Sequence, residues 1–171
     1  MYHKEQIEFV QKSDADLVTA LTITNVPEAV GIVRAARSRG LPVVVSFTLE
    51  TDGSLPTGQS LQQAIEAVDN ATGHSCAYYM INCAQPTHFS AAIATSEPWV
   101  KRVRGLRANA SRLSHAELNE ASVLDCGDPL ELAAQYADLL RRHPHVNILG
   151  GCCGTDHRHI QEIARACKTD S

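Results

Sequence analysis

The sequence predicts an α/β protein built on one parallel sheet. Short apolar runs alternate along the chain with longer segments of helical periodicity, and strands that alternate with helices form parallel sheets with crossover helices. The run at residues 41–48 is apolar without clean alternation, as expected when both faces of a strand are buried. No linker or low-complexity segment interrupts the pattern, so residues 1–171 are predicted to form a single domain.

The first half of the chain opens with a mixed segment, residues 5–12, that is suited to a short helix. The β-branched and apolar residues 16–22 predict the first strand. A helix follows from Asn25, a good N-cap residue, to about residue 39, and Gly40 stands where a helix stop is expected. The run at 41–48 is the second strand.

The second half repeats the alternation of strands and helices. Two glycines and a proline predict a loop at residues 50–58, and Asp156 is the expected cap of the last helix. The remaining strands are expected at residues 78–83, 103–108 and 146–151. The remaining helices are expected at residues 60–71, 88–95, 114–120, 129–142 and 156–167.

Composition narrows the class of protein. The chain has 171 residues, of which 44% are hydrophobic and 20% charged, as in ordinary soluble domains. A net charge of −4 and the lack of a basic run argue against nucleic-acid binding. No apolar stretch reaches the length of a membrane span, and the N-terminus has no signal-peptide core. A cytoplasmic location is therefore expected, where thiols stay reduced. The six cysteines are then interpreted as metal ligands or core residues and not as disulfides.

Two adjacent cysteines end the last predicted strand, within the segment from Val146 to Thr155. Thiolates are soft metal ligands and nucleophiles. Neighbouring side chains of a regular strand point to opposite faces, so Cys152 and Cys153 can share one metal only if the backbone leaves strand geometry there. We expect Gly150, Gly151 and Gly154 to supply that conformational freedom.

A third cysteine follows another predicted strand, where Ile81 and Asn82 lead into Cys83. If both strands belong to one parallel sheet, all three thiols lie at its carboxyl edge, where α/β proteins place their chemistry. The alternative is three buried cysteines without a metal, since free cysteine is among the most buried residue types.

These motifs resemble the zinc-dependent homocysteine S-methyltransferases. The resemblance rests on Ile81-Asn82-Cys83 and on the Gly-Gly-Cys-Cys-Gly-Thr motif at residues 150–155. The segments Val45-Ser46-Phe47-Thr48 and Arg107-Ala108-Asn109-Ala110 support it, and the likeness covers nearly the whole chain.

The resemblance implies a TIM barrel with its site at the carboxyl ends of the strands. It implies that Cys83, Cys152 and Cys153 bind one Zn²⁺ and that the homocysteine sulfur takes the open fourth position. The homocysteine thiolate then accepts a methyl group from a small donor, such as S-methylmethionine, S-adenosylmethionine or betaine, to give methionine. Asn82 and Asn109 match motif positions near the site and are expected to bind substrate.

Two departures from the family pattern shape the expectation. The five predicted units resemble the fourth to eighth units of the barrel, so a partial barrel that lacks its first three units is expected. Leu21 stands where the family usually carries a glutamate for the substrate's amino group. Two alternatives therefore stay open: an inactive zinc-binding remnant, or one half of a split barrel that needs a partner chain or self-associates through its open edges.

For the other polar residues near strand ends, both a functional and an ordinary structural role are open. Thr48 and Thr155 can bind a ligand or serve turns and caps, and Glu50 and Asp52 can meet a substrate amine or lie in a solvated loop. The histidines at 157 and 159 are expected on the first turn of the last helix, solvated or near a loop. Three further cysteines are expected to be core or surface thiols: Cys76, Cys126 and Cys167.

Overall fold

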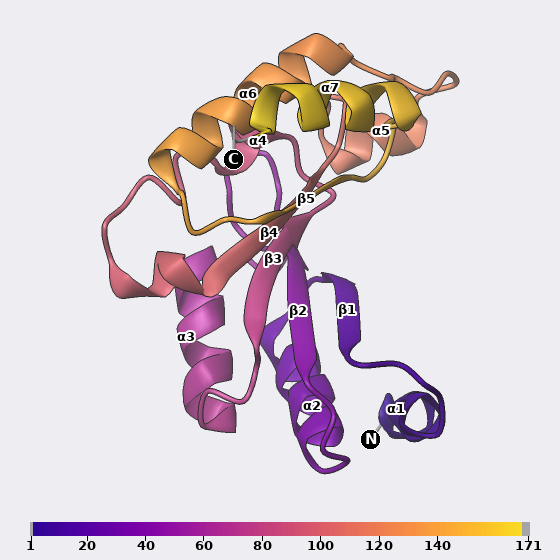
Figure 1. Cartoon of the computed structure of the whole chain (residues 1–171), viewed down its shortest axis with the longest axis vertical. Helices are drawn as coiled ribbons and strands as arrows, with labels where there is room; N and C mark the ends of the chain where they lie inside the picture. The colour runs from indigo at the N-terminus through magenta and orange to yellow at the C-terminus, as the bar shows by residue number, and fades with distance from the viewer. Residues whose placement is uncertain (1, 169–171) are drawn as a thin grey trace.

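A computed structural model describes residues 2–168 and contains one five-stranded sheet (Figure 1). All four pairings are parallel, and the strands lie in the order β1-β2-β3-β4-β5. The strands are β1 (Val18–Ile23), β2 (Val43–Thr48), β3 (Tyr78–Asn82), β4 (Val103–Ala108) and β5 (Ile148–Gly151). The predicted α/β class and the five parallel strands are confirmed.

Helices connect the strands, and several are fixed by caps that the sequence provides. Asn25, Ser60 and Asp128 each accept hydrogen bonds from backbone N–H groups of the first turn that follows. The helices are α1 (Lys4–Gln11), α2 (Val26–Arg37), α3 (Leu61–Thr72), α4 (Pro86–Phe89), α5 (His115–Glu120), α6 (Pro129–Arg142) and α7 (His157–Cys167), with a 3-10 helix η1 (Pro98–Arg102). Among residues 2–168, no helix is long and apolar enough to cross a bilayer.

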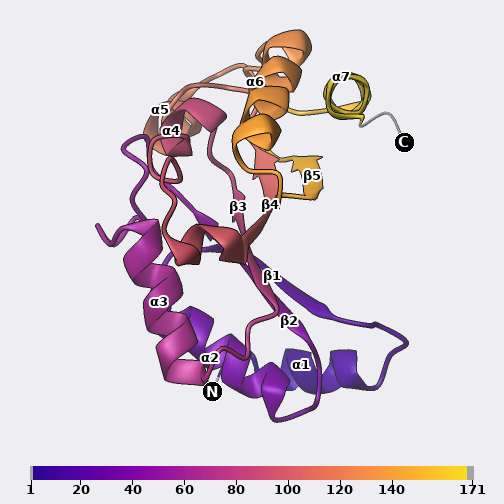
Figure 2. The same cartoon turned by 60° about the vertical axis from the view of Figure 1, so that its left-hand side comes forward.

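The strand order never reverses along the sheet. Right-handed crossovers then bring successive helices to the same face, whereas a doubly wound sheet reverses its order and carries helices on both faces. The buried residues of α2, α3, α6 and α7 accordingly join one hydrophobic cluster with the strands, and α6 packs along α7 (Figure 2). The arrangement is consistent with part of a TIM-type barrel wall.

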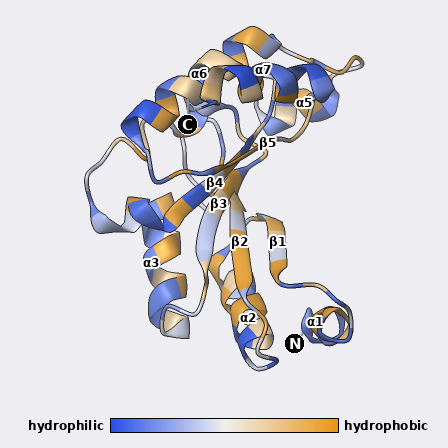
Figure 3. Ribbon diagram, viewed as in Figure 1, coloured by the Kyte–Doolittle hydropathy of each residue, from blue (hydrophilic) through white to orange (hydrophobic). Residues whose placement is uncertain are grey.

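The core lies between the sheet and these helices. Every residue of β2 is buried, and its ribbon is among the most hydrophobic of the molecule, whereas α5 is mainly hydrophilic (Figure 3). Phe47 and Tyr79 stack in neighbouring strands with ring centroids 6.0 Å apart. Ser46 and Thr48 alternate with Phe47 and therefore face away from the helices, on the side where Asn82 also lies.

The predicted helix at residues 88–95 is wrong: α4 covers only residues 86–89. Further along, the backbone bonds close turns: the Ala94 N–H donates to the Ala91 carbonyl at 3.2 Å and the Thr95 N–H to the Ile93 carbonyl at 2.8 Å. The sequence pattern also gave no sign of η1. Most other element boundaries differ from the prediction by one or two residues.

Candidate metal centre

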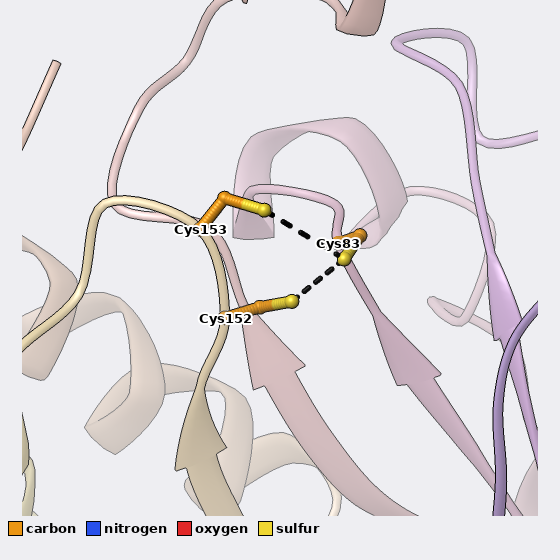
Figure 4. A group of neighbouring side chains, drawn as sticks. All are labelled: Cys83, Cys152 and Cys153. Carbon is orange, nitrogen blue, oxygen red and sulfur yellow. Dashed lines mark hydrogen bonds between the residues drawn. The ribbon is translucent and has the colours of Figure 1, made fainter. Parts of the chain in front are cut away.

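Three cysteine thiols meet at the carboxyl edge of the sheet (Figure 4). Cys83 directly follows β3, while Cys152 and Cys153 directly follow β5. The Sγ atom of Cys83 lies 2.6 Å from that of Cys152 and 4.0 Å from that of Cys153, and all three sulfurs lie within 4.8 Å of one another. Cys83 and Cys152 are 69 positions apart in sequence. They meet because only β4 lies between β3 and β5 in the sheet.

The backbone leaves strand geometry where the two adjacent cysteines begin. The Cys152 N–H still continues the ladder and donates to the Ala108 carbonyl at 2.8 Å. The Cys153 N–H instead donates to the side-chain Oδ1 of Asn109 at 3.1 Å, and the Cys153 carbonyl accepts from the Ala110 N–H at 3.0 Å. This turn lets neighbouring thiols point toward Cys83 together, which a regular strand does not allow.

Glycines serve this turn in two different ways. Gly154 has a φ of 76°, so its left-handed conformation is the freedom expected from the sequence. Gly150 and Gly151 lie inside β5 without positive φ, so the expectation of special backbone angles is wrong for them. Gly151 is needed for space, because a Cβ there would collide with the Thr155 side chain.

A tyrosine from α6 joins the two strands beneath the cysteine turn. The Tyr136 hydroxyl accepts a hydrogen bond from the Ala108 N–H at 2.9 Å and donates to the Gly150 carbonyl at 2.8 Å. Tyr136 is fully buried, and burial raises the pKa of its hydroxyl above the ordinary value, so the hydroxyl keeps its proton for the second bond. The strand that precedes Cys152 is thereby fixed to β4 and to α6.

Cys83 adopts a left-handed backbone conformation, with φ at 53°, which is uncommon for residues other than glycine. Its N–H donates to the Arg107 carbonyl at 3.2 Å, and its carbonyl accepts from the His115 Nε2 atom at 2.6 Å. The other ring nitrogen of His115 lies 3.2 Å from a Glu50 carboxylate oxygen. No local sequence pattern marks His115 as a site residue, although a capping box at Ser114 fixes the start of its helix.

Asn82 is buried and bonded within the protein. Its Oδ1 atom accepts from the Thr22 N–H at 2.9 Å and from the Ser46 hydroxyl at 2.6 Å, and its Nδ2 donates to the Thr22 hydroxyl at 2.8 Å. These bonds fix an irregular end of β1, where the register with β2 shifts and Thr22 has a φ of 59°. Asn82 thereby ties the ends of three strands together beside Cys83.

Without a metal, the thiols interact strongly with one another. The hydrogen bond from the Cys83 thiol lowers the pKa of Cys152 to about 5, and the same bond raises the pKa of Cys83. Burial, followed by the nearby charge of Cys152, raises the pKa of Cys153. One thiolate is therefore favoured in the cluster, and its neighbours hold their protons until a cation compensates the added charge.

The donor set fits a zinc ion. In tetrahedral zinc–thiolate sites the Zn–S distance is about 2.3 Å, which separates the sulfurs by about 3.8 Å. The 4.0 Å separation of Cys83 and Cys153 is close to that spacing, whereas the contact of Cys83 and Cys152, at 2.6 Å, has to widen. Three cysteines supply three of the four ligands that tetrahedral zinc takes.

The cluster is accessible, because a cavity of about 620 Å³ is lined by Cys83 and Cys153. Polar side chains from three strand ends and from the start of α5 share its wall: Thr22, Thr24, Thr48, Asn109 and His115. Leu21 instead lines a separate cavity between β1 and α1. The larger cavity therefore gives access to Cys83 and Cys153 without contact with Leu21.

Several other polar residues named from the sequence have structural contacts. The Thr155 hydroxyl donates to the Cys152 carbonyl at 2.7 Å, which is a turn role. Asp52 accepts from the N–H and the hydroxyl of Ser54 in an exposed loop. Glu50, by contrast, reaches His115 beside the cluster.

The remaining histidines and cysteines lie outside the cluster. His157 is exposed, and His159 lies near a loop, the second of the two expected situations: its side chain is fully buried, and its Nε2 donates to the Cys126 carbonyl at 2.8 Å. Cys76 is a core residue, and Cys126 and Cys167 are half-buried.

The sequence profile of the family described as "Homocysteine S-methyltransferase" matches residues 1–167. The chain belongs to the homocysteine S-methyltransferase family. It is 25% identical over 166 residues to homocysteine S-methyltransferase 3 of Arabidopsis thaliana, covering 96% of this chain and 47% of that protein. It is 24% identical over 172 residues to homocysteine S-methyltransferase 1 of Brassica oleracea var. italica, covering 98% of this chain and 51% of that protein. The chain thus spans about half the length of these curated relatives.

Proposed function

We propose that this member of the homocysteine S-methyltransferase family binds Zn²⁺ through Cys83, Cys152 and Cys153 and takes part in the methylation of homocysteine. The observation that carries the proposal is the convergence of three thiols from two strand ends on an open cavity. Zinc held by three thiolates leaves one position for a substrate thiol and keeps that thiol ionised near neutral pH.

The protein's own part is to hold the sulfurs and to orient the substrate. Asn109 fixes the turn of Cys153, and His115 holds the carbonyl of Cys83. Asn109 also lines the cavity, so its amide supports substrate binding there, as the family resemblance implies. For Asn82, which is bonded to Thr22 and Ser46, we propose that it acts on the substrate through the position of Cys83.

The proposed reaction is a displacement at carbon. The homocysteine sulfur forms a new S–C bond with the methyl group, while the bond from that methyl group to the sulfonium or ammonium atom of the donor breaks. The electron pair of the broken bond stays with the donor, which leaves uncharged at that atom, and the other product is methionine. A donor with a positive charge is favoured because this charge disappears as the donor leaves.

The first test is the zinc content of the reduced, purified chain. About one zinc ion per chain is expected, with loss of the metal in Cys152→Ser and retention in the matched Cys126→Ser variant, whose thiol lies outside the cluster. X-ray absorption should show sulfur ligation that gains one sulfur when homocysteine is added. Methionine formation is then assayed with S-methylmethionine, S-adenosylmethionine and betaine. Absence of zinc, or equal loss in both variants, would refute the proposed site.

A second candidate is a zinc-binding protein that does not turn over alone, or that needs a partner chain. It is favoured by Leu21, which stands where the family usually carries a glutamate for the substrate's amino group; Leu21 is 40% exposed and lies outside the cavity of the thiols. It is also favoured by the unpaired sides of β1 and β5 within residues 2–168. Zinc that gains no sulfur ligand from homocysteine would support this candidate over the methyltransferase.

A further inference from the structure

The cavity beside the cysteines contains a buried hydroxyl without a partner. Thr48, at the end of β2, is 3% exposed, and within the described part of the chain its Oγ1 atom makes no hydrogen bond. Buried polar atoms are nearly always paired, so an orphan at a cavity wall marks a place where a ligand atom completes the bond. Thr48 is also the register partner of Asn82, the residue before Cys83, so it stands one strand away from the proposed thiol site.

Two more threonines in the same wall have a proton to donate. The Thr22 hydroxyl accepts from the Asn82 Nδ2 at 2.8 Å, and the Thr24 hydroxyl accepts from the Asn25 Nδ2 at 3.4 Å. A hydroxyl that accepts one bond can still donate its own proton. Thr22 lies close to the cluster, with its oxygen 4.0 Å from the Cys83 sulfur. We call Thr22, Thr24 and Thr48 the threonine trio.

The carboxylates near the cavity are already engaged. Glu50 faces His115. Asp125 accepts from the Ser111 hydroxyl at 2.6 Å and from the Gly127 N–H at 2.9 Å. Among residues 2–168, the Thr48 hydroxyl therefore has no acceptor for its proton. An ionised carboxylate is an acceptor-only group and is the natural complement of such a wall.

We infer that the threonine trio is the subsite for the carboxylate of a thiol-bearing amino acid, with Thr48 as the residue that supplies the buried donor. This inference rests on the proposed function for the thiol end of the ligand. An amino acid whose sulfur lies at Cys83 and Cys153 has its carboxylate within the reach of the neighbouring strand end, because adjacent strands are about 4.8 Å apart. Thr48 then selects amino-acid thiols over thiols that lack a carboxylate.

The test compares three thiols on the full chain loaded with Co²⁺, whose thiolate absorption band reports binding. The thiols are homocysteine, 4-mercaptobutyrate, which lacks the amine, and 3-aminopropanethiol, which lacks the carboxylate. Thr48→Val keeps the shape and removes the donor. We expect it to weaken the first two thiols roughly tenfold, the loss of one hydrogen bond to a charged group, and to leave 3-aminopropanethiol unchanged.

Two controls separate this role from a structural one. Thr48→Ser keeps the hydroxyl and should retain most of the carboxylate preference. In the metal-free chain, Thr48→Val should keep or raise the Tm, since it removes an unpaired buried hydroxyl. Equal weakening of all three thiols, or no weakening of any, would overturn the inference.

The inference can fail separately from the proposed function. If the chain binds neither Co²⁺ nor Zn²⁺, the proposed metal site fails, and the subsite is tested on the metal-free chain by ligand-observed NMR. The ligands are then 4-(methylthio)butyrate and 3-(methylthio)propylamine. Binding of the carboxylate alone, lost in Thr48→Val, supports the subsite, whereas no binding or equal binding of both overturns it.

Discussion

The side-chain Oδ1 of Asn109 accepts the backbone N–H of Cys153 at 3.1 Å. Asn109 follows β4, the strand between those that lead to Cys83 and to Cys152. Its amide replaces the ladder bond that a continued strand would have made, so the chain can turn and bring Cys153 beside Cys152. The buried Asn109 side chain thus fixes the turn that lets the thiols of Cys152 and Cys153 both face Cys83.

Asn109→Ala should weaken zinc binding by roughly 10- to 100-fold, the usual effect of losing an outer contact that orients a ligand. The reason is that the Cys153 N–H loses its acceptor and the turn loses its fixed geometry. Competition with a chromophoric chelator measures the affinity. Asn119→Ala is the matched control, because Asn119 lines the same cavity but is exposed. Equal affinities of the two variants would contradict the role of Asn109.

His115→Ala should also weaken metal binding, by about tenfold or more. The lost bond is the one from Nε2 to the Cys83 carbonyl, which restrains a left-handed residue. His115→Gln retains a donor at a similar reach and should recover part of the affinity. The Tm of the metal-free variants is measured alongside, since a loss confined to metal affinity separates positioning of Cys83 from general destabilisation.

His143→Phe should stabilise the fold, and more so at acid pH. His143 is buried, and within residues 2–168 its Nε2 has no partner. Burial lowers the pKa of His143, and the neighbouring His145 and Arg142 lower it further. The unfolded chain therefore takes up a proton near pH 6.5 that the folded chain resists, so stability falls as the pH drops below about 6.5.

The His143→Phe variant loses this pH-dependent penalty. Urea unfolding should show a gain of roughly 1 kcal/mol at pH 7.5, from removal of the unpaired nitrogen, and a larger gain at pH 5.5. The exposed His157→Phe is the control and should change neither value appreciably. A gain that is the same at both pH values would show that titration of His143 has no part in it.

The purified chain should self-associate through the side of β1. Within the described residues β1 pairs with β2 alone, and Leu21 is 40% exposed on it. A charge on an edge strand opposes pairing with another chain, so Leu21→Lys should lower the mass found by light scattering after gel filtration. Phe9→Lys changes an exposed apolar residue of α1 and should have less effect. A monodisperse wild-type monomer with a sharp unfolding transition would refute the expectation.

Much of the fold was predictable from local sequence signals. The strand at residues 103–108 and the helix at 129–142 have the predicted bounds, since Pro129 and its Asp128 cap define a helix start without help from distant residues. The helix predicted at 88–95 ends early, because the N–H groups of Ala94 and Thr95 close tight turns instead of helical bonds. A pattern of apolar residues does not reveal that change of hydrogen bonding.

Of the candidate site, only the three cysteine thiols were predictable from the sequence. Cysteines after apolar runs indicate the thiols, because parallel strands end at one edge. The contact of His115 with Cys83 spans 32 residues and depends on how the segment after β4 returns over the sheet, which no local signal determines. Likewise, Gly151 is required by the nearness of Thr155 and not by its own backbone angles.

The Tyr136 hydroxyl, bonded to both the Ala108 N–H and the Gly150 carbonyl, has a consequence for how the site can vary. No residue of α6 supplies a thiol, yet this helix sets the spacing between the strand before Asn109 and the strand before Cys152. Substitutions on the buried side of α6 will therefore alter the cysteine cluster from a distance. Tyr136 is thereby as much a part of the geometry of the cluster as the residues that carry the sulfur atoms.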